Sequence, residues 1–153
     1  MDIKEFCKTL KPYQAILGFD FGTKRLGIAV SDLGRMIATP YVIIDRTSFK
    51  KDIEQIKKIV SEKQIGGLVY GLPKQMDGTE GQTAEMVREF ALKVSRQIDL
   101  PYTFWDERLS SKAVESALIR EADMSRKKRQ KVLDSSAAAY ILQGALDMMS
   151  YFS

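Results

Sequence analysis

The spacing of apolar residues changes at about position 46, and this change divides the chain into two parts. Before it, three short apolar runs at 15–21, 26–31 and 36–44 are separated by connections of a few residues. Such runs predict the three strands of an antiparallel meander. Pro40 places the third strand at a sheet edge or beside a bulge, because proline has no backbone N–H to donate.

Beyond this point, helical and extended spacing alternate along the chain. The expected elements are a helix from Thr47 or Ser48 to about 63, a strand at 65–70, a helix opened by a capping box at 79–82 and reaching about 98, and a strand at 102–105. A helix from Ser110 or Ser111 to about 121, a basic stretch and a final helix to about Met149 complete the chain. This alternation favours parallel strands with right-handed crossovers.

The order of these elements predicts one α/β domain over 13–153, with a five-stranded mixed sheet flanked by helices. Residues 1–12 are expected to form a leader with a short, loosely docked helix. The apolar runs are too short to span a membrane, and the N-terminus lacks the pattern of a signal peptide. The single cysteine, Cys7, cannot form an internal disulfide, so a cytoplasmic location is expected.

Composition narrows the chemistry that the chain can perform. It has 153 residues, a net charge of +4 and no histidine. The mildly basic charge permits a nucleic-acid partner without requiring one. The missing histidine excludes Ser-His and Cys-His nucleophile systems and the usual zinc sites. A metal cofactor would then be a hard cation with oxygen ligands, Mg²⁺ or Mn²⁺.

Two acidic positions lie at the ends of predicted strands. Asp20 lies inside an apolar strand, where an unpaired carboxylate is costly to desolvate. We therefore favour a functional role for it over that of a turn aspartate. Asp106 and Glu107 end the fifth strand, and only one of them can share the face of Asp20 because side chains alternate along a strand. A solvated turn explains these two acids equally well.

A third acid belongs to the final helix. Asp134 precedes Ala138, Ile141 and Ala145 at helical spacing, which places it at the start of a buried stripe. A helix-capping role fits Asp134 equally well. If the three acids converge, their mutual repulsion requires one or two metal ions, which would activate water for phosphodiester hydrolysis.

Basic residues form a second set. Lys24 and Arg25 occupy the short connection after Asp20, and six further lysines and arginines lie between 120 and 131. They fit a rim that contacts a nucleic-acid backbone, although most such runs are solvated surface. The segment 71–81, which includes Lys74, is rich in glycine and could bind a phosphate, or it is ordinary turn chemistry.

Four blocks together resemble the bacterial YqgF/RuvX family, which has an RNase H-like fold. They are Ile16 to Asp32, Gly71 to Gly81, Asp106 to Ser111 and Asp134 to Gln143, and they occur in the order of the family. The resemblance implies either a nuclease that matures the 5′ end of pre-16S rRNA, which we favour, or a Holliday junction resolvase acting on branched DNA.

The resemblance also implies site residues. Asp20, Glu107 and Asp134 match the acidic positions that hold metal and carry out catalysis, and the substrate-binding positions are Lys24, Arg25, Lys74 and Arg108. Related resolvases carry an acid at the end of the fourth strand, where this chain has Gly71-Leu72-Pro73, so Glu107 would have to substitute for it.

Two other functions remain open on sequence grounds. A non-catalytic nucleic-acid-binding module would keep the basic surface and make the acids structural. Asp20 to Thr23 also resembles the first phosphate loop of actin-like ATPases, but the chain is too short for their two lobes. A junction resolvase would need a two-fold homodimer to cut symmetrically.

Overall fold

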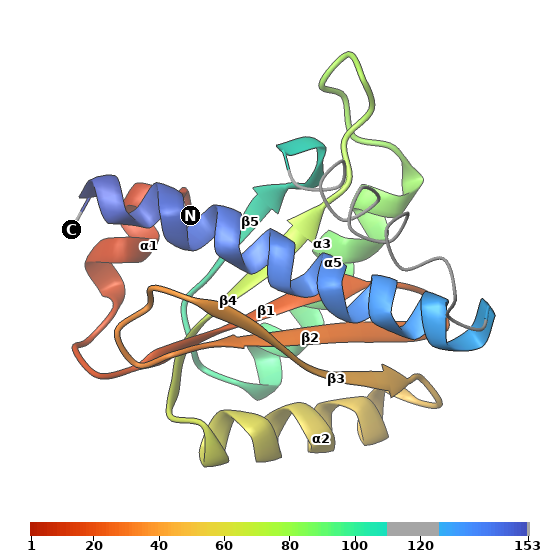
Figure 1. Cartoon of the computed structure of the whole chain (residues 1–153), viewed down its shortest axis with the longest axis horizontal. Helices are drawn as coiled ribbons and strands as arrows, with labels where there is room; N and C mark the ends of the chain where they lie inside the picture. The colour runs from red at the N-terminus through yellow and green to blue at the C-terminus, as the bar shows by residue number, and fades with distance from the viewer. Residues whose placement is uncertain (110–125, 153) are drawn as a thin grey trace.

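A computed structural model describes residues 1–109 and 126–152, with the backbone alone at 109 and 126–136. Five strands form one mixed sheet in the order β3-β2-β1-β4-β5 (Figure 1). They are β1 (Ala15–Phe21), β2 (Arg25–Ser31), β3 (Ala38–Asp45), β4 (Ile65–Leu72) and β5 (Tyr102–Asp106). Strands β1, β2 and β3 pair antiparallel, while β4 pairs parallel with both β1 and β5. The predicted meander with added parallel strands is confirmed.

Pro40 meets both expectations for a proline in a strand. It lies on β3, which is an edge strand of the sheet. The β2–β3 register also shifts there, because Ile28 pairs with Val42 whereas Ala29 pairs with Pro40. The shift leaves Tyr41 as the extra residue of a bulge.

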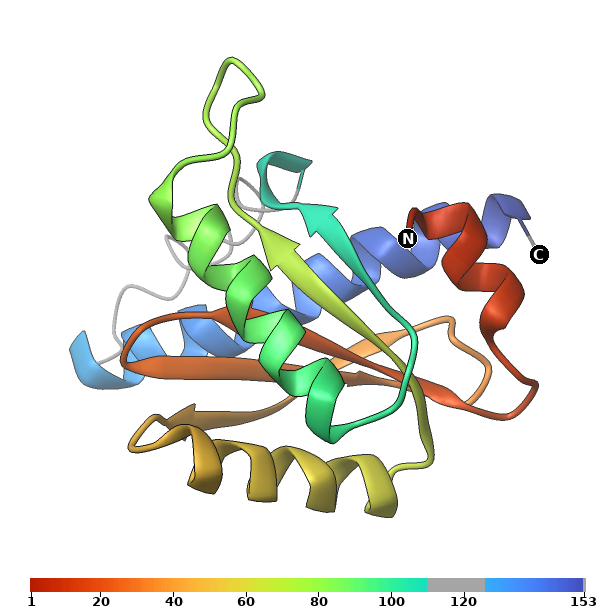
Figure 2. The same cartoon turned by 180° about the vertical axis from the view of Figure 1, so that it is seen from behind.

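Helices cover both faces of the sheet. Helices α2 (Phe49–Glu62) and α3 (Gln82–Gln97) pack on one face, and α1 (Ile3–Thr9) and α5 (Arg126–Met149) pack on the other (Figures 1 and 2). Short 3₁₀ turns follow β5, as η1 (Glu107–Leu109), and α5, as η2 (Ser150–Phe152). Helix α5 crosses all five strands. The sheet is therefore the central layer of three.

Each face of the sheet has its own hydrophobic core. On the α2/α3 face, the rings of Phe19 and Tyr70 stack with their centroids 4.9 Å apart. The α5 face buries Ala138, Ile141 and Ala145, the stripe predicted from sequence. That stripe fixes which side of α5 faces the sheet.

Two expectations were wrong in detail. The predicted capping box does not form, because α3 begins after Gly81 without a side-chain cap, and the Thr79 hydroxyl bonds Asp77 instead. Helix α1 is not loosely docked, because Phe6 is fully buried against the α5 face. The helix predicted from Ser110 or Ser111 to 121 lies outside the described residues.

In the described ranges, 1–109 and 126–152, the helices are too short or too polar to cross a membrane.

Candidate active site

Asp20 is carried to the end of β1 by the hairpin with β2. It pairs with Gly27 across the hairpin, and the turn that follows is tight. A β carbon on Gly22 would lie 2.6 Å from the Arg25 carbonyl oxygen, so only glycine fits there. On the same strand, Gly18 contacts Leu142 of α5. Because alternate residues share a face, Asp20 also faces the α5 side.

Glu107 reaches the same place from a neighbouring strand end. It is the first residue of η1, directly after β5. A β carbon on Gly71 of β4 would lie 2.6 Å from Glu107 Oε1 and 2.5 Å from Ile141 Cδ1. The Glu107 side chain therefore lies over the end of β4.

Asp20 and Glu107 form a pair of facing carboxyl groups. Burial raises the pKa of Glu107, the hydrogen bond with the Asp20 side chain lowers it, and the charge of Asp106 raises it further. Two carboxyl groups can share a hydrogen bond only while one of them is protonated. Without a cation, the pair therefore retains a proton more readily than an isolated glutamate does.

Asp106 is excluded from this pair by strand alternation. Its carboxylate accepts from Arg108 Nε at 3.0 Å and from Arg108 Nη2 at 2.7 Å. These bonds hold the pKa of Asp106 below its ordinary value. Of the two acids at the end of β5, only Glu107 meets Asp20.

The third predicted acid, Asp134, is on the described backbone of α5, eight residues after its first turn begins at Arg126. Its side chain lies outside the described residues. Ala138 and Ile141, four and seven residues further on, are buried against the sheet. Helical spacing therefore predicts that Asp134 shares the face of these two residues.

The donor set fits a hard divalent cation. Asp20 and Glu107 offer oxygen ligands, and their like charges at hydrogen-bond distance need compensation. In the portion of the chain with described side chains, no three acids, cysteines or histidines gather into a cluster that could hold an ion. The third ligand expected from sequence is Asp134.

The predicted basic residues differ in their surroundings. Lys24 is exposed in the turn after Asp20, and Arg25 is half-buried at the start of β2. Lys74 follows β4 and forms an isolated bridge with Glu80. Hydrogen bonds from Arg88 and Arg108 are the main cause of the lowered pKa values of Glu80 and Asp106, and the charge of Lys74 adds to both shifts. Three cationic side chains thus lie along the chain segments that leave the site.

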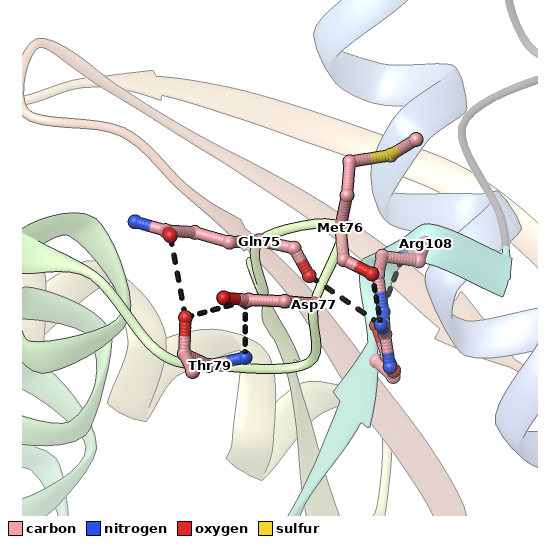
Figure 3. A network of polar contacts seen from close by, with 6 residues as sticks. Gln75, Met76, Asp77, Thr79 and Arg108 are labelled. Atoms are coloured by element: carbon pink, nitrogen blue, oxygen red, sulfur yellow. Dashed lines mark hydrogen bonds and ion pairs between the residues drawn. The ribbon is translucent and has the colours of Figure 1, made fainter.

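Arg108 contacts its own chain. Besides Asp106, its Nη1 approaches the carbonyl oxygens of Gln75 and Met76, each at 3.4 Å (Figure 3). These contacts join the end of β5 to the loop 73–81. Its role in substrate binding stays a prediction, and the structure adds a role in holding this loop.

One supporting interaction was missed by sequence reasoning. Arg46 donates to Asp52 at 3.1 Å and to the Gly22 carbonyl at 3.0 Å, and it lies over the ring of Phe21. Asp52 is 1% exposed. The pair therefore fixes the turn that presents Asp20. The signal was Asp52 itself, an acid that shares a helical face with Ile56 and Ile59.

Known proteins resemble this chain over nearly its whole length. A family profile described as "RuvX: Holliday junction resolvase" matches residues 14–148. A protein of Paramagnetospirillum magneticum named "Putative pre-16S rRNA nuclease" is 49% identical, covering 97% of this chain and 96% of its own. A protein of Paracoccus denitrificans with the same name is 48% identical, covering 98% and 94%.

Among solved structures, RuvC of T. thermophilus in complex with a Holliday junction substrate superposes with a TM-score of 0.55 at 11% identity. The match covers 90% of this chain and 96% of that one. At this identity the likeness concerns the fold alone, and it confirms the RNase H-like class.

Proposed function

This chain belongs to the RuvX family, and from that premise we propose that it is a metal-dependent nuclease that hydrolyses phosphodiester bonds in the maturation of the 5′ end of pre-16S rRNA. The observation that carries the proposal is the half-buried Asp20–Glu107 pair, built over Gly71 at the carboxyl ends of parallel strands. Strand ends of this kind are where α/β sheets place their sites. The names of the relatives supply the favoured substrate, and such a substrate implies a cytoplasmic enzyme.

Asp20, Glu107 and Asp134 are the proposed metal ligands. Bound Mg²⁺ or Mn²⁺ would supply charge compensation for the acids and Lewis-acid activation of the phosphodiester and of water. Lys24, Arg25 and Lys74 hold the backbone phosphates on either side of the bond that breaks. Arg108 assists them by fixing the loop that carries Lys74.

The test is cleavage of two labelled substrates, a 16S precursor leader RNA and a synthetic four-way DNA junction. Each is incubated with Mg²⁺, with Mn²⁺ and with EDTA. The proteins are the unaltered chain, Asp20→Asn and the control Asp99→Asn, whose exposed acid lies before β5 at the opposite end of the sheet. Changes around metal ligands already cost about 10–100-fold, so loss of a ligand should cost at least about 100-fold.

Metal-dependent cutting of the RNA that is lost in Asp20→Asn and kept in Asp99→Asn supports the proposal. Paired nicks in the DNA junction alone would favour the second candidate, a resolvase, which the description of the family supports. A chain that cuts neither substrate is not a nuclease, and a binding module would replace the proposal.

A further inference from the structure

Met76 is held in solvent at the tip of a loop beside the candidate site. Its side chain is 97% exposed, more than any other large apolar side chain described. The loop 73–81 leaves the carboxyl end of β4 and projects beyond the sheet, next to η1 (Figures 1 and 2). A side chain with this exposure contributes little to the packing of the described residues.

The loop is ordered by its own hydrogen bonds. The Gln75 amide donates to the Thr79 carbonyl and the Gly78 amide donates to the Gln75 carbonyl, each at 2.8 Å. Asp77 accepts from the Thr79 amide at 2.9 Å, and its pKa lies below the ordinary value because of its bonds to Thr79. Gly78, with φ +88°, closes the turn. The tip is therefore pre-organised rather than a free coil.

The same loop is tied to the catalytic end of β5. Arg108, the residue after Glu107, reaches the carbonyl oxygens of Gln75 and Met76. Asp106 holds the guanidinium from the other side with bonds to Nε and Nη2. Figure 3 shows the Met76 side chain pointing away from this network. The position of the tip is thus set by the residues on either side of Glu107.

The size of the apolar tip indicates its partner. Between Lys74 and Thr79, Met76 is the only apolar side chain. A stable protein interface needs about 800 Å² from each partner, which one side chain cannot supply. A single methionine is enough to enter one base step, and thioethers contact aromatic rings favourably. Lys74 at the base of the loop adds a cation for the neighbouring phosphate.

We propose that Met76 is a wedge that packs against a nucleobase where the substrate strand leaves a duplex, close to the phosphodiester that is cut at the Asp20–Glu107 site. The wedge rests on the proposed nuclease function and deepens it. It assigns a substrate class, a nucleic acid with a base that is unstacked close to the cleavage site.

The experiment uses a precursor leader stem–loop RNA with 2-aminopurine placed in turn at each position around the duplex end. Binding is measured with Asp20→Asn, with Asp20→Asn/Met76→Ser and with Asp20→Asn/Met76→Leu. Leucine keeps an apolar side chain of similar size, so it is the matched control. We expect one 2-aminopurine position to brighten with methionine and leucine but not with serine.

The second measurement is the cleavage rate, for which the Met76 variants keep Asp20. The contact between the thioether and the base is lost with serine, so Met76→Ser should cut the duplex-end RNA up to about tenfold more slowly. Its rate on a fully single-stranded RNA should match that of the unaltered chain, because no base has to be unstacked. Met76→Leu should cut both RNAs normally. If Met76 contributed only to folding, Met76→Ser would cut both RNAs more slowly by the same factor.

Equal fluorescence and equal rates for serine and leucine would overturn the wedge and leave the nuclease standing; a contact with another protein would then explain the exposed tip. Loss of cleavage by every protein, with the fluorescence change intact, would overturn the nuclease and support the wedge. An RNA that is neither bound nor cut would overturn both.

Discussion

The Glu107 carboxylate lies over Gly71, where Oε1 would be 2.6 Å from a β carbon. Glu107 follows β5, yet its carboxylate lies at the end of the neighbouring strand β4. Glycine at 71 is what leaves the space, because any side chain there would meet both Glu107 and Ile141. A glycine in place of an acid at the end of β4 therefore leaves room for the carboxylate of Glu107.

Gly71→Ala should therefore damage the site more than the fold. An added methyl in a packed core costs about 1–3 kcal/mol of unfolding free energy. Displacement of a reacting group by about 1 Å can cost about 100-fold in rate, and the Glu107 side chain must move to make room. Urea unfolding and cleavage assays measure the two effects separately.

The matched control is Gly67→Ala on the same strand. Its β carbon would lie 2.6 Å from the Phe6 ring, at the other end of β4 and on the same face. It should lose similar stability while its activity, measured well below its unfolding temperature, stays close to normal. An equal loss of activity in both variants would remove the special role of Gly71.

The topology could be predicted from the sequence because strands, turns and helices are each marked by patterns of neighbouring residues. Apolar runs, turns and helical stripes identified all five strands, and Ser48 caps α2 as expected. The capping box failed because Thr79 has a closer partner in Asp77, which turns the chain before the helix begins. The sequence pattern alone does not show that the Thr79 hydroxyl bonds to Asp77 rather than capping the helix.

The arrangement of the candidate acids was predicted in part. Strand alternation left Asp106 and Glu107 as alternatives, and resemblance to a family indicated Glu107. The structure separates them, because Arg108 engages Asp106 and leaves Glu107 to Asp20. The support of the Gly22 turn by Arg46 joins residues that are distant in sequence. Spacing in the sequence marks Asp52 on an apolar helical face, but it does not show which residues Arg46 contacts.

Glu107→Gln should stabilise the protein at neutral pH when no metal is present. The pKa of Glu107 is raised in the fold, chiefly by burial. Below the ordinary glutamate pKa of about 4.3 the group is neutral in both states, and its stability contribution is fully present. That contribution is lost as pH rises through the folded-state pKa, because a half-buried carboxyl must then ionise.

Thermal unfolding in EDTA at pH 4 and pH 7.5 tests this. The unfolding temperature of Glu107→Gln should rise relative to that of the unaltered chain between pH 4 and pH 7.5. Saturating Mg²⁺ should then raise the unfolding temperature of the unaltered chain but barely that of the variant, since binding stabilises only the form that holds the ion. A pH-independent difference between the two proteins would argue against ionisation of Glu107 as the cause.

Asp52→Ala should weaken both the fold and the turn after Asp20. The variant leaves Arg46 without its buried partner, and breaking such pairs costs about 3–5 kcal/mol. The Arg46 side chain is 19% exposed, so we expect a loss at the lower end of this range, about 3 kcal/mol. Urea unfolding measures it, with exposed Asp99→Ala as the control that should change by less than about 0.5 kcal/mol.

Phe6→Ala should show that α1 belongs to the core. Phe6 is fully buried, and its ring contacts Gly67 on β4, so truncation leaves a cavity between α1 and the sheet. Losses of this kind cost about 3–5 kcal/mol, whereas the exposed neighbour Lys4→Ala should stay within about 0.5 kcal/mol. Urea unfolding compares the two variants, and hydrogen exchange at the β4 and β5 amides reports where the loss acts. A Phe6→Ala protein as stable as Lys4→Ala would mean that residues 1–12 are a leader that contributes nothing to the domain.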